Sequence, residues 1–366
     1  MDIFQKLAER GHEEIIFCND EEVGLKAIIA IHNTVLGPAL GGCRMYPYGS
    51  FEEAMQDALR ISRAMTYKAA VAGLNLGGGK AVIIADSKEL SKDPERREML
   101  FRSFGRFLQS AAGRFMTGED VGTNVQDMEY IKKETDDVTG FPMALGGSGD
   151  PSPVAAYGTF RGILACVAKA YGNPSLRGLK VVVEGVGNVG RYLVKHLYDE
   201  GAKIFIYDTD QEKVRSILND FEGVEFIEGG KIYGFDADIY APCALGSTIN
   251  DDTIKKFKFK VIAGSANNQL AIEEKHGKML LEKGIIYAPD FVINSGGLIN
   301  VYTELEGYNQ EKALRKAKHI YDVVAEVLDI AEKDNIPSYL AANKLAEERI
   351  ADMRVKKKIS TINKIK

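Results

Sequence analysis

The segment from Val181 to Gly190, which reads VVVEGVGNVG, restricts the possible folds more than any other part of the chain. Its apolar start predicts a buried strand, and the glycines follow the pattern G-x-G-x-x-G at the point where a helix would begin. Gly185 permits a tight turn, Gly187 lets backbone approach a pyrophosphate, and Gly190 allows close packing of helix on strand. A Rossmann-type, doubly wound dinucleotide-binding domain is therefore predicted around this segment.

A carboxylate follows the next predicted strand. Residues 203–207 (KIFIY) are apolar and end at Asp208, 18 residues after Gly190. A carboxylate at this position accepts hydrogen bonds from the ribose hydroxyls of the adenosine and repels a 2′-phosphate. Since no arginine directly follows Asp208, NAD is predicted rather than NADP. The alternative, a tightly packed turn that binds nothing, stays open at this point.

The chain length of 366 residues predicts two domains. The stretch Gly146–Pro153 is rich in glycine, serine and proline, which makes it the candidate hinge. We therefore expect an α/β fold with two domains: a first α/β domain over residues 1–147, to which residues 335–366 return as helices, and a Rossmann-type domain over residues 148–334.

Alternating strands and helices are expected throughout. In the first domain, Glu14–Cys18 and Leu25–His32 have the composition of strands. Helices are predicted for Phe51–Ala70, with Ser50 as N-cap and Glu53 as its capping-box partner, and for Pro94–Ala112. After the hinge, strands are expected at 180–184, 203–207, 239–241, 261–263 and 285–287, with a helix at 191–200. The chain beyond Ile299 is expected to be helical.

Composition narrows the function class. No run of 18 apolar residues exists, so no membrane span is predicted. The net charge of −5 argues against a nucleic-acid partner. Neither a signal sequence nor a metal-ligand spacing of histidine and cysteine is apparent, and the four cysteines are scattered. We therefore expect a cytoplasmic protein with reduced thiols, no metal, and a small-molecule substrate.

Two lysines flank three consecutive glycines. Lys68 and Lys80 enclose the sequence AAVAGLNLGGG. Because glycine in a helix or strand costs backbone entropy, Gly77–Gly79 are expected to form a turn that presents a side chain beside a ligand. A solvent-facing charge is the commoner fate of a lysine. The apolar neighbours instead predict partly desolvated ammonium groups, and desolvation lowers a lysine pKa toward the range of a general base.

A carboxylate-bearing turn, Thr117–Thr123, follows an apolar stretch that ends at Met116. It contains Asp120, a second candidate for proton transfer. Taken alone, such a turn with ordinary surface acids is the more common situation.

Several motifs together resemble one family. They are residues 37–42 (GPALGG), 68–80, the Glu-Asp-Val-Gly turn at Asp120, 264–269 (GSANNQ) and 294–297 (NSGG). The chain resembles the glutamate/leucine/phenylalanine/valine dehydrogenase family over almost its whole length. Within that family it is most similar to the leucine-using members, including the ending at Leu345–Ile350.

The resemblance implies a reaction and roles for three residues. The reaction is the reversible, NAD-dependent oxidative deamination of an L-amino acid to a 2-oxo acid, ammonium and NADH. Lys68 would bind the substrate α-carboxylate, Lys80 would be the general base that activates water, and Asp120 would exchange protons with the amino group. The first domain would be the catalytic and oligomerisation domain, and a homo-oligomer, typically an octamer, is implied.

The resemblance also implies the binding residues. Those for NAD are Ser152, Gly185, Val186, Gly187, Asn188, Val189, Gly190, Asp208, Ala244, Leu245, Ala266, Asn267 and Asn294. Besides Lys68, those for the substrate are Leu40, Gly41, Gly42, Gly118, Asn267, Leu298 and Val301.

Three of these positions bear on the choice of amino acid. Glutamate-using members carry a lysine where this chain has Leu40, so a substrate carboxylate would lack a partner and glutamate is disfavoured. Gly118 and Leu298 are the pair more typical of phenylalanine-using members. Leucine, valine and isoleucine are expected, with phenylalanine as the alternative. A nucleotide-binding subunit without catalysis is the competing class, although Lys68, Lys80 and Asp120 are all present.

Overall fold

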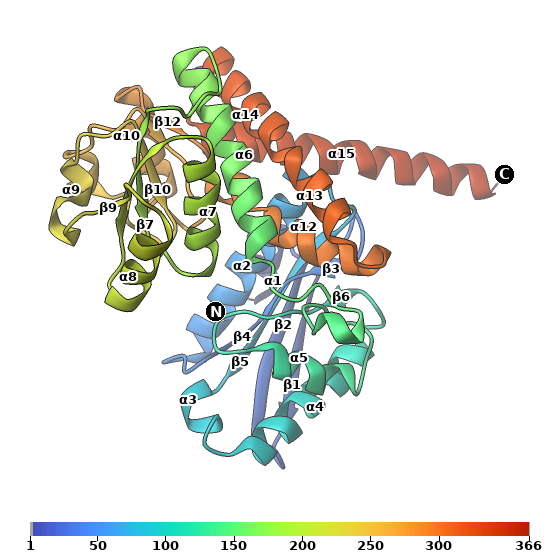
Figure 1. The fold of residues 1–366 in the computed structure, drawn as a ribbon. Coiled ribbons are helices and arrows are strands. Elements are labelled where there is room, and N and C mark those ends of the chain that lie inside the picture. Colours follow the sequence, from blue (N-terminus) through green and yellow to red (C-terminus); the bar gives the residue numbers. More distant parts are fainter. Residues whose placement is uncertain (1–2, 366) are drawn as a thin grey trace. The chain divides into compact units, whose positions relative to one another are not determined.

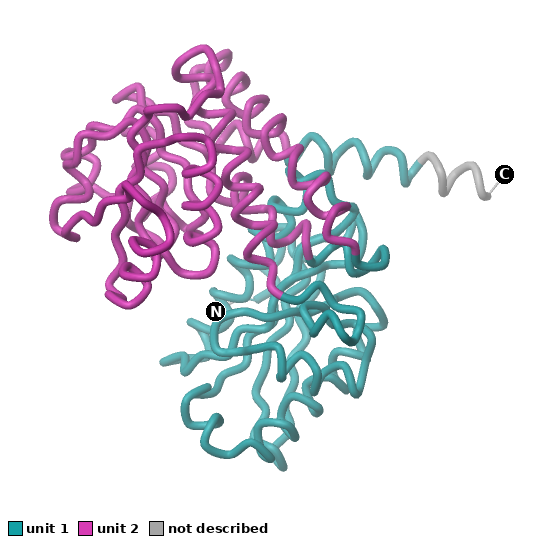
Figure 2. The backbone as a smooth tube through the Cα atoms, viewed as in Figure 1, with its two compact units in different colours: residues 1–149, 301–308, 346–366 teal, residues 150–300, 309–345 magenta. Residues whose placement is uncertain are grey.

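The computed structural model describes residues 3–365. The chain forms two compact units, coloured separately in Figure 2. Unit 1 comprises residues 1–149, 301–308 and 346–366, and unit 2 comprises residues 150–300 and 309–345. These units differ from the expected division in three places, because residues 148–149 and 301–308 belong to unit 1 and residues 335–345 to unit 2.

Unit 1 contains a mixed six-stranded sheet in the order β1-β2-β5-β3-β6, with β4 also paired to β5. The strands are β1 (Glu14–Asp20), β2 (Leu25–Asn33), β3 (Ala39–Leu40), β4 (Cys43–Tyr46), β5 (Gly77–Ile84) and β6 (Phe115–Met116). The two strands expected near the N-terminus are confirmed as β1 and β2. Strand β5 pairs antiparallel with β2 and parallel with β3 and β4.

Helices bury both faces of this sheet (Figure 1). They are α1 (Ile3–Arg10), α2 (Phe51–Val71), α3 (Ser87–Leu90), α4 (Pro94–Ser110) and α5 (Val125–Lys132). In β2, Ile28 packs with residues of α2, whereas Ile29 packs with residues of α4. A strand covered on both sides must be apolar at every position, which explains the continuous apolar run in its sequence.

Ser50 caps the N-terminus of α2 as expected, but the predicted capping box is not completed, because Glu53 bonds to Gly49 and not to the backbone of the N-cap residue. The side chain of Ser50 accepts a hydrogen bond from the Glu53 N–H at 3.2 Å, and the Glu53 carboxylate accepts one from the Gly49 N–H at 3.0 Å. At its other end, α2 contacts α15 (Ser338–Ile365), since Arg349 donates to the carbonyl of Ala70 at 2.8 Å. The part of α15 around Arg349 therefore packs within unit 1.

The prediction of a turn at Gly77–Gly79 is wrong, because all three glycines lie inside β5. Glycine is needed at these positions because neighbouring elements pack closely against the strand, and not because the backbone adopts a special conformation. A Cβ would lie 1.9 Å from the Asn33 carbonyl oxygen at Gly77, 2.1 Å from the Thr66 nitrogen at Gly78 and 2.5 Å from the Phe115 ring at Gly79. Neighbouring elements on both faces approach the strand more closely than any side chain would permit.

Unit 2 contains a parallel six-stranded sheet in the order β12-β11-β10-β7-β8-β9. The strands are β7 (Lys180–Glu184), β8 (Lys203–Tyr207), β9 (Glu225–Phe226), β10 (Ile239–Pro242), β11 (Val261–Ile262) and β12 (Ile286–Tyr287). The chain starts at β7 and builds outward to both edges, which is the doubly wound arrangement. The predicted Rossmann-type fold and its five expected strands are confirmed.

The remaining helices belong mostly to unit 2. They are α6 (Ser152–Tyr171), α7 (Asn188–Asp199), α8 (Gln211–Asp220), α9 (Asp251–Ile254), α10 (Glu273–Glu282), α11 (Asp290–Ile293), α12 (Gly296–Tyr302), α13 (Gln310–Lys318) and α14 (Ile320–Asp334). No helix was expected over most of α6, and this helix begins inside the predicted hinge at Ser152. Within the described residues, no helix is both long and apolar enough to span a membrane.

Candidate active site

Lys80 is a buried cation on the central strand of unit 1. It lies on β5 opposite Ala30, is 1% exposed, and pairs with Oδ2 of Asp120. Burial, and after it the nearby Arg44 guanidinium, lower the Lys80 pKa to about 7. The predicted desolvation of this ammonium group is confirmed. A lysine with such a pKa exchanges protons near neutral pH.

The loop that carries Asp120 is fixed beside β4. The N–H of Cys43 donates to the Gly118 carbonyl at 2.8 Å, and the N–H of Met45 donates to the Val121 carbonyl at 2.9 Å. Gly122 has a φ of +82°, and a Cβ there would lie 2.0 Å from the Met45 carbonyl oxygen. The loop is therefore held by backbone hydrogen bonds along one edge and can turn only with glycine at position 122.

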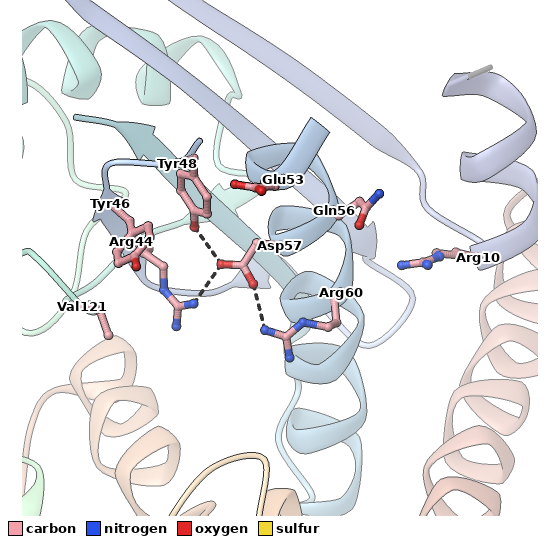
Figure 3. Close-up of a pocket in the computed structure, with 9 residues that line it drawn as sticks. All are labelled: Arg10, Arg44, Tyr46, Tyr48, Glu53, Gln56, Asp57, Arg60 and Val121. Atoms are coloured by element: carbon pink, nitrogen blue, oxygen red, sulfur yellow. Dashed lines mark hydrogen bonds and ion pairs between the residues drawn. The ribbon is translucent and has the colours of Figure 1, made fainter. Parts of the chain in front are cut away.

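A chain of charged side chains extends from Asp120 to α2, and Figure 3 shows its part from Arg44 through Asp57 to Arg60. Arg44 donates to Oδ1 of Asp120 from Nε and Nη2, each at 3.2 Å, and to Oδ2 of Asp57 from Nη1 at 2.8 Å. Asp57 also accepts from the Tyr48 hydroxyl at 2.7 Å and from Arg60 at 2.8 Å. Arg44, Tyr48, Asp57 and Arg60 line a pocket of about 520 Å³, which Val121 of the Asp120 loop also lines.

The network around Arg44 was not anticipated from the sequence. Arg44 follows the glycine pair that ends at Gly42, and β4 (CRMY) buries its first and third residues. A charged residue between two buried neighbours in so short a strand is the signal that could have indicated it. Its partner Asp57 lies on α2, and no spacing rule connects the two.

The predicted substrate positions in the first half of the chain lie around β5. Lys68 is half-buried on α2, and Leu40 is 3% exposed on β3, opposite Gly78. A Cβ at Gly41 would lie 1.8 Å from the Gly79 carbonyl oxygen.

Two further predicted substrate positions are glycines: Gly42 lies beside the Asp120 loop, and Gly118 lies at its start. A Cβ at Gly42 would lie 2.9 Å from that of Asp120, and one at Gly118 would lie 3.0 Å from Oγ1 of Thr139. The structure thus brings Gly42 next to Asp120 and leaves little room for a larger residue at Gly118.

The glycine-rich turn of unit 2 has the predicted geometry. Gly185 has a φ of +98°, and a Cβ there would lie 2.6 Å from that of Ala244. A Cβ at Gly190 would lie 2.0 Å from the Gly185 carbonyl oxygen, so helix and strand meet closely. At Gly187, by contrast, a Cβ would meet no described atom within 4 Å. The turn is therefore tightly packed beneath and open at the position where backbone would approach a pyrophosphate.

Asp208 lies against this turn. Its Oδ2 accepts a hydrogen bond from the Val186 N–H at 2.9 Å, and its Oδ1 accepts one from the Asp210 N–H at 2.9 Å. The carboxylate is thus fixed at the carboxyl end of β8, where adenosine ribose binds in Rossmann folds. Asn188 and Val189 form the first turn of α7, whose free N–H groups favour anions.

The other predicted cofactor residues lie in loops after the strands and at two helix ends. Ala244 and Leu245 follow β10, and the Leu245 side chain is 78% exposed. Asn294 donates to Oδ1 of Asn267 at 2.7 Å, while its own buried Oδ1 accepts no hydrogen bond from the described residues. A buried carbonyl oxygen in this state suits a ligand that carries a donor. Ala266 is buried after β11, and Ser152 is buried at the start of α6.

Leu298 and Val301 both lie on α12. Leu298 is 8% exposed and belongs to unit 2, whereas Val301 is half-buried and belongs to unit 1.

Known proteins resemble this chain over nearly its whole length. A leucine dehydrogenase of Thermoactinomyces intermedius is 55% identical, with 97% of this chain and 95% of that protein covered. A phenylalanine dehydrogenase of Bacillus thermotolerans is 48% identical, with 95% and 90% covered. The crystal structure of L-tryptophan dehydrogenase from Nostoc punctiforme has a TM-score of 0.86 and 43% identity, covering 96% of this chain and 99% of that one.

Two family profiles also match. Residues 12–137 match the "Glu/Leu/Phe/Val dehydrogenase, dimerisation domain", and residues 205–357 match the "Glutamate/Leucine/Phenylalanine/Valine dehydrogenase" domain. Together they span most of both units. The chain belongs to the glutamate/leucine/phenylalanine/valine dehydrogenase family and is an amino-acid dehydrogenase.

Proposed function

We propose that this protein catalyses the reversible NAD-dependent oxidative deamination of L-leucine, and of other branched-chain L-amino acids, to the 2-oxo acid, ammonium and NADH. The observation that carries the proposal is the buried Lys80, which is paired with Asp120 and has a pKa of about 7. A general base is most effective when its pKa lies near the working pH.

Lys80 acts as the base that activates water for attack on the iminium carbon. In its neutral form it takes a proton from the water, and in its charged form it stabilises the oxyanion that develops. Lys68, on the α2 helix that packs against β5, binds the substrate α-carboxylate. Two cations beside one carboxylate substrate provide both binding and stabilisation of negative charge.

Asp120 exchanges protons with the substrate amino group. Its Oδ2 is the oxygen that faces Lys80, so it can pass a proton between the amine and its surroundings. Its position depends on the hydrogen-bonded loop beside β4 described above.

NAD fits the residues of unit 2. Gly185, Gly187 and Gly190 would accommodate the pyrophosphate at the α7 N-terminus, and the Asp208 carboxylate would accept the ribose hydroxyls. The unpartnered Oδ1 of Asn294 would accept a hydrogen bond from the bound dinucleotide. Bound there, NAD would supply the acceptor for the hydride that leaves Cα of the amino acid. Because Asp208 repels a 2′-phosphate, NAD is proposed over NADP.

An apolar substrate is supported by Leu40, which is buried and offers a side-chain carboxylate no partner. Several relatives at 52–55% identity are leucine dehydrogenases, which favours leucine. Gly118 and Leu298 instead favour phenylalanine, which we retain as the second candidate. We further propose that the protein is cytoplasmic and assembles as a homo-oligomer, with an octamer as the expected form.

The test is the appearance of NADH absorbance with L-leucine, L-phenylalanine or L-glutamate, each with NAD and with NADP. We expect the highest kcat/KM with leucine and NAD. Absence of turnover with every pair would favour a non-catalytic nucleotide-binding protein. A preference for glutamate would contradict the inference from Leu40, and a preference for NADP would contradict the one from Asp208.

A further inference from the structure

The Asp120 carboxylate is held by cations on two sides. Its Oδ1 accepts hydrogen bonds from Nε and Nη2 of Arg44, each at 3.2 Å, and from the Val121 N–H at 2.5 Å. Its Oδ2 faces the Lys80 ammonium. We propose that Arg44 is a positioning residue of the reaction, which fixes Oδ1 of Asp120 so that Oδ2 alone is directed at Lys80 and at the substrate amine. The inference rests on the proposed function.

Arg44 is itself held in one geometry. Its Nη1 donates to Oδ2 of Asp57 at 2.8 Å, and that oxygen also accepts from the Tyr48 hydroxyl at 2.7 Å. The other Asp57 oxygen accepts from Arg60 at 2.8 Å (Figure 3). The guanidinium group therefore links β4, α2 and the Asp120 loop. Its planar fork matches this role, because two of its nitrogens point at one carboxylate and the third at another.

Burial strengthens these contacts. The side chains of Arg44, Asp57 and Asp120 are 24%, 16% and 18% exposed, and that of Lys80 is 2% exposed. Charges that are mostly removed from water interact more strongly than surface pairs. Arg44 therefore acts on Lys80 both through Asp120 and through its own charge.

The charges around Lys80 act on it in opposite directions. The charged and titratable groups that face it from β4, α2 and the loop are Cys43, Arg44, Asp57, Arg60 and Asp120. Burial is the largest cause of the lowered Lys80 pKa, Arg44 is the next, and Asp57 opposes them. Loss of the Arg44 charge should therefore raise the Lys80 pKa, and loss of the Asp57 charge should lower it.

A purely structural role for Arg44 makes a different prediction. If it only joined β4 to α2, its replacement would change stability and leave the pH dependence of catalysis unchanged. The same would hold for Asp57. Opposite pH shifts in the two variants are thus specific to the proposed role.

The experiment measures kcat and kcat/KM for L-leucine against pH in four variants. In Arg44→Gln, we expect the acid limb of kcat/KM to move up by about one pH unit and kcat to fall at least about tenfold. In Arg44→Lys, the limb should stay near that of the wild type while kcat remains low, because an ammonium group keeps the charge but lacks the fork. In Asp57→Asn, the limb should move down.

Arg102→Gln is the matched control. Arg102 pairs with Glu134 at 2.6 Å on the surface of the same unit and should keep the wild-type profile. An Arg44→Gln variant with wild-type thermal stability and an unchanged acid limb would overturn the proposal. So would shifts of the same sign in Arg44→Gln and Asp57→Asn. If Arg44→Gln does not fold, the other two variants test the proposal. A wild-type kcat in Arg44→Lys, or an unshifted acid limb in Asp57→Asn, would overturn it.

A second readout separates this inference from the proposed function. The rate at which acetic anhydride labels Lys80, followed by peptide mass spectrometry without substrate, reports the Lys80 pKa directly. The labelling curve should shift in the same direction as the acid limb. If the wild type turned over no amino acid, the proposed function would fail, whereas the labelling would still show whether Arg44 and Asp57 control Lys80.

Discussion

The guanidinium group of Arg97 holds both carboxylate oxygens of Asp127, with Nε 2.7 Å from Oδ1 and Nη2 2.6 Å from Oδ2. The side chains are 8% and 0% exposed. Nη2 also donates to the Gly122 carbonyl at 3.0 Å, two residues beyond Asp120. A buried ion pair is thus hydrogen-bonded to the loop that carries the proposed proton-transfer group.

Asp127→Asn should destabilise unit 1 and impair catalysis. Breaking one partner of a buried pair leaves the other charge uncompensated, which costs about 3–5 kcal/mol. Urea denaturation measures the loss, and kcat should fall because the Asp120 loop loses its support. The control is Asp136→Asn, since Asp136 pairs with Lys132 on the surface and is 96% exposed. Equal midpoints for the two variants would contradict the role given to the Arg97–Asp127 pair.

Lys80→Ala should abolish turnover and leave NADH binding intact, because Lys80 lies in unit 1 and the proposed dinucleotide residues lie in unit 2. NADH fluorescence measures binding, and absorbance measures turnover. In the wild type, kcat/KM should rise with pH through about 7, since Lys80 acts as a base only when deprotonated. Lost NADH binding in the variant would show that the two functions are divided differently between the units.

Acid should destabilise the protein through two buried histidines. His32 contacts Oγ1 of Thr66 at 2.7 Å, and the His12 ring lies 4.8 Å from it. Burial lowers the pKa of His32 to about 4 and also lowers that of His12. The unfolded chain, with a histidine pKa of about 6.5, therefore binds more protons between pH 6.5 and 4. As pH falls through this window, the free energy of unfolding should decrease, by on the order of 3 kcal/mol for His32.

Urea denaturation at several pH values measures this effect. His32→Gln should flatten the dependence between pH 6.5 and 4. His319→Gln should leave it unchanged, because His319 lies at the surface, with its side chain 76% exposed. The same slope in both variants would exclude His32 as a source.

Gly187→Ala should fold normally and bind NAD weakly. Its φ of −67° suits any residue, and a Cβ meets no described atom within 4 Å, so stability should be unaffected. The added methyl would occupy the space through which backbone approaches the pyrophosphate. We expect the KM for NAD to rise by about tenfold or more, equivalent to about 1.4 kcal/mol. An unchanged KM would contradict the proposed placement of the dinucleotide.

Gly78→Ala is the matched comparison. A Cβ there would lie 2.1 Å from the Thr66 nitrogen, so this variant should lose stability whether or not NAD is present. If both variants lost stability equally, Gly187 would have a structural role as well.

Gly118→Ala combined with Leu298→Val should raise the preference for leucine over phenylalanine. These are the residues more typical of leucine-using relatives, and one methylene changes specificity by about 1–3 kcal/mol. The ratio of kcat/KM for the two substrates measures the effect, with an expected change of about tenfold. Since a Cβ at position 118 would lie 3.0 Å from Oγ1 of Thr139, the triple variant with Thr139→Ala, which removes that oxygen, controls for crowding. An unchanged ratio in both the double and the triple variant would show that these positions do not select the substrate.

Local pattern was sufficient for much of the fold. The alternation of apolar strands and helices after Lys180 predicted five strands of the unit 2 sheet, and the spacing of the glycines predicted the turn at Gly185. The apolar neighbours of Lys80 predicted its burial. In each case, neighbouring residues in the sequence supply the physical cause.

The predictions that failed share a different cause, which is packing against residues distant in sequence. Gly77–Gly79 were expected to form a turn, because glycine weakens a strand. The three glycines nevertheless form part of a strand. Asn33, Thr66 and Phe115, which are distant in sequence, pack so closely against it that no side chain would fit. Helix α6 was not expected, because its apolar residues are buried on several sides by other helices and show no clear amphipathic period.

By itself, the sequence determined which residues are candidates for the proposed reaction: a lysine in apolar surroundings, a carboxylate in a turn, and a glycine pattern after a strand. Only the tertiary structure decided how they act together. Asp120 meets Lys80 across 40 residues and Arg44 across 76 residues of sequence, and Arg44 is held by Asp57 on a helix. Charges couple through space, so the pKa of Lys80 depends on contacts that no local pattern encodes.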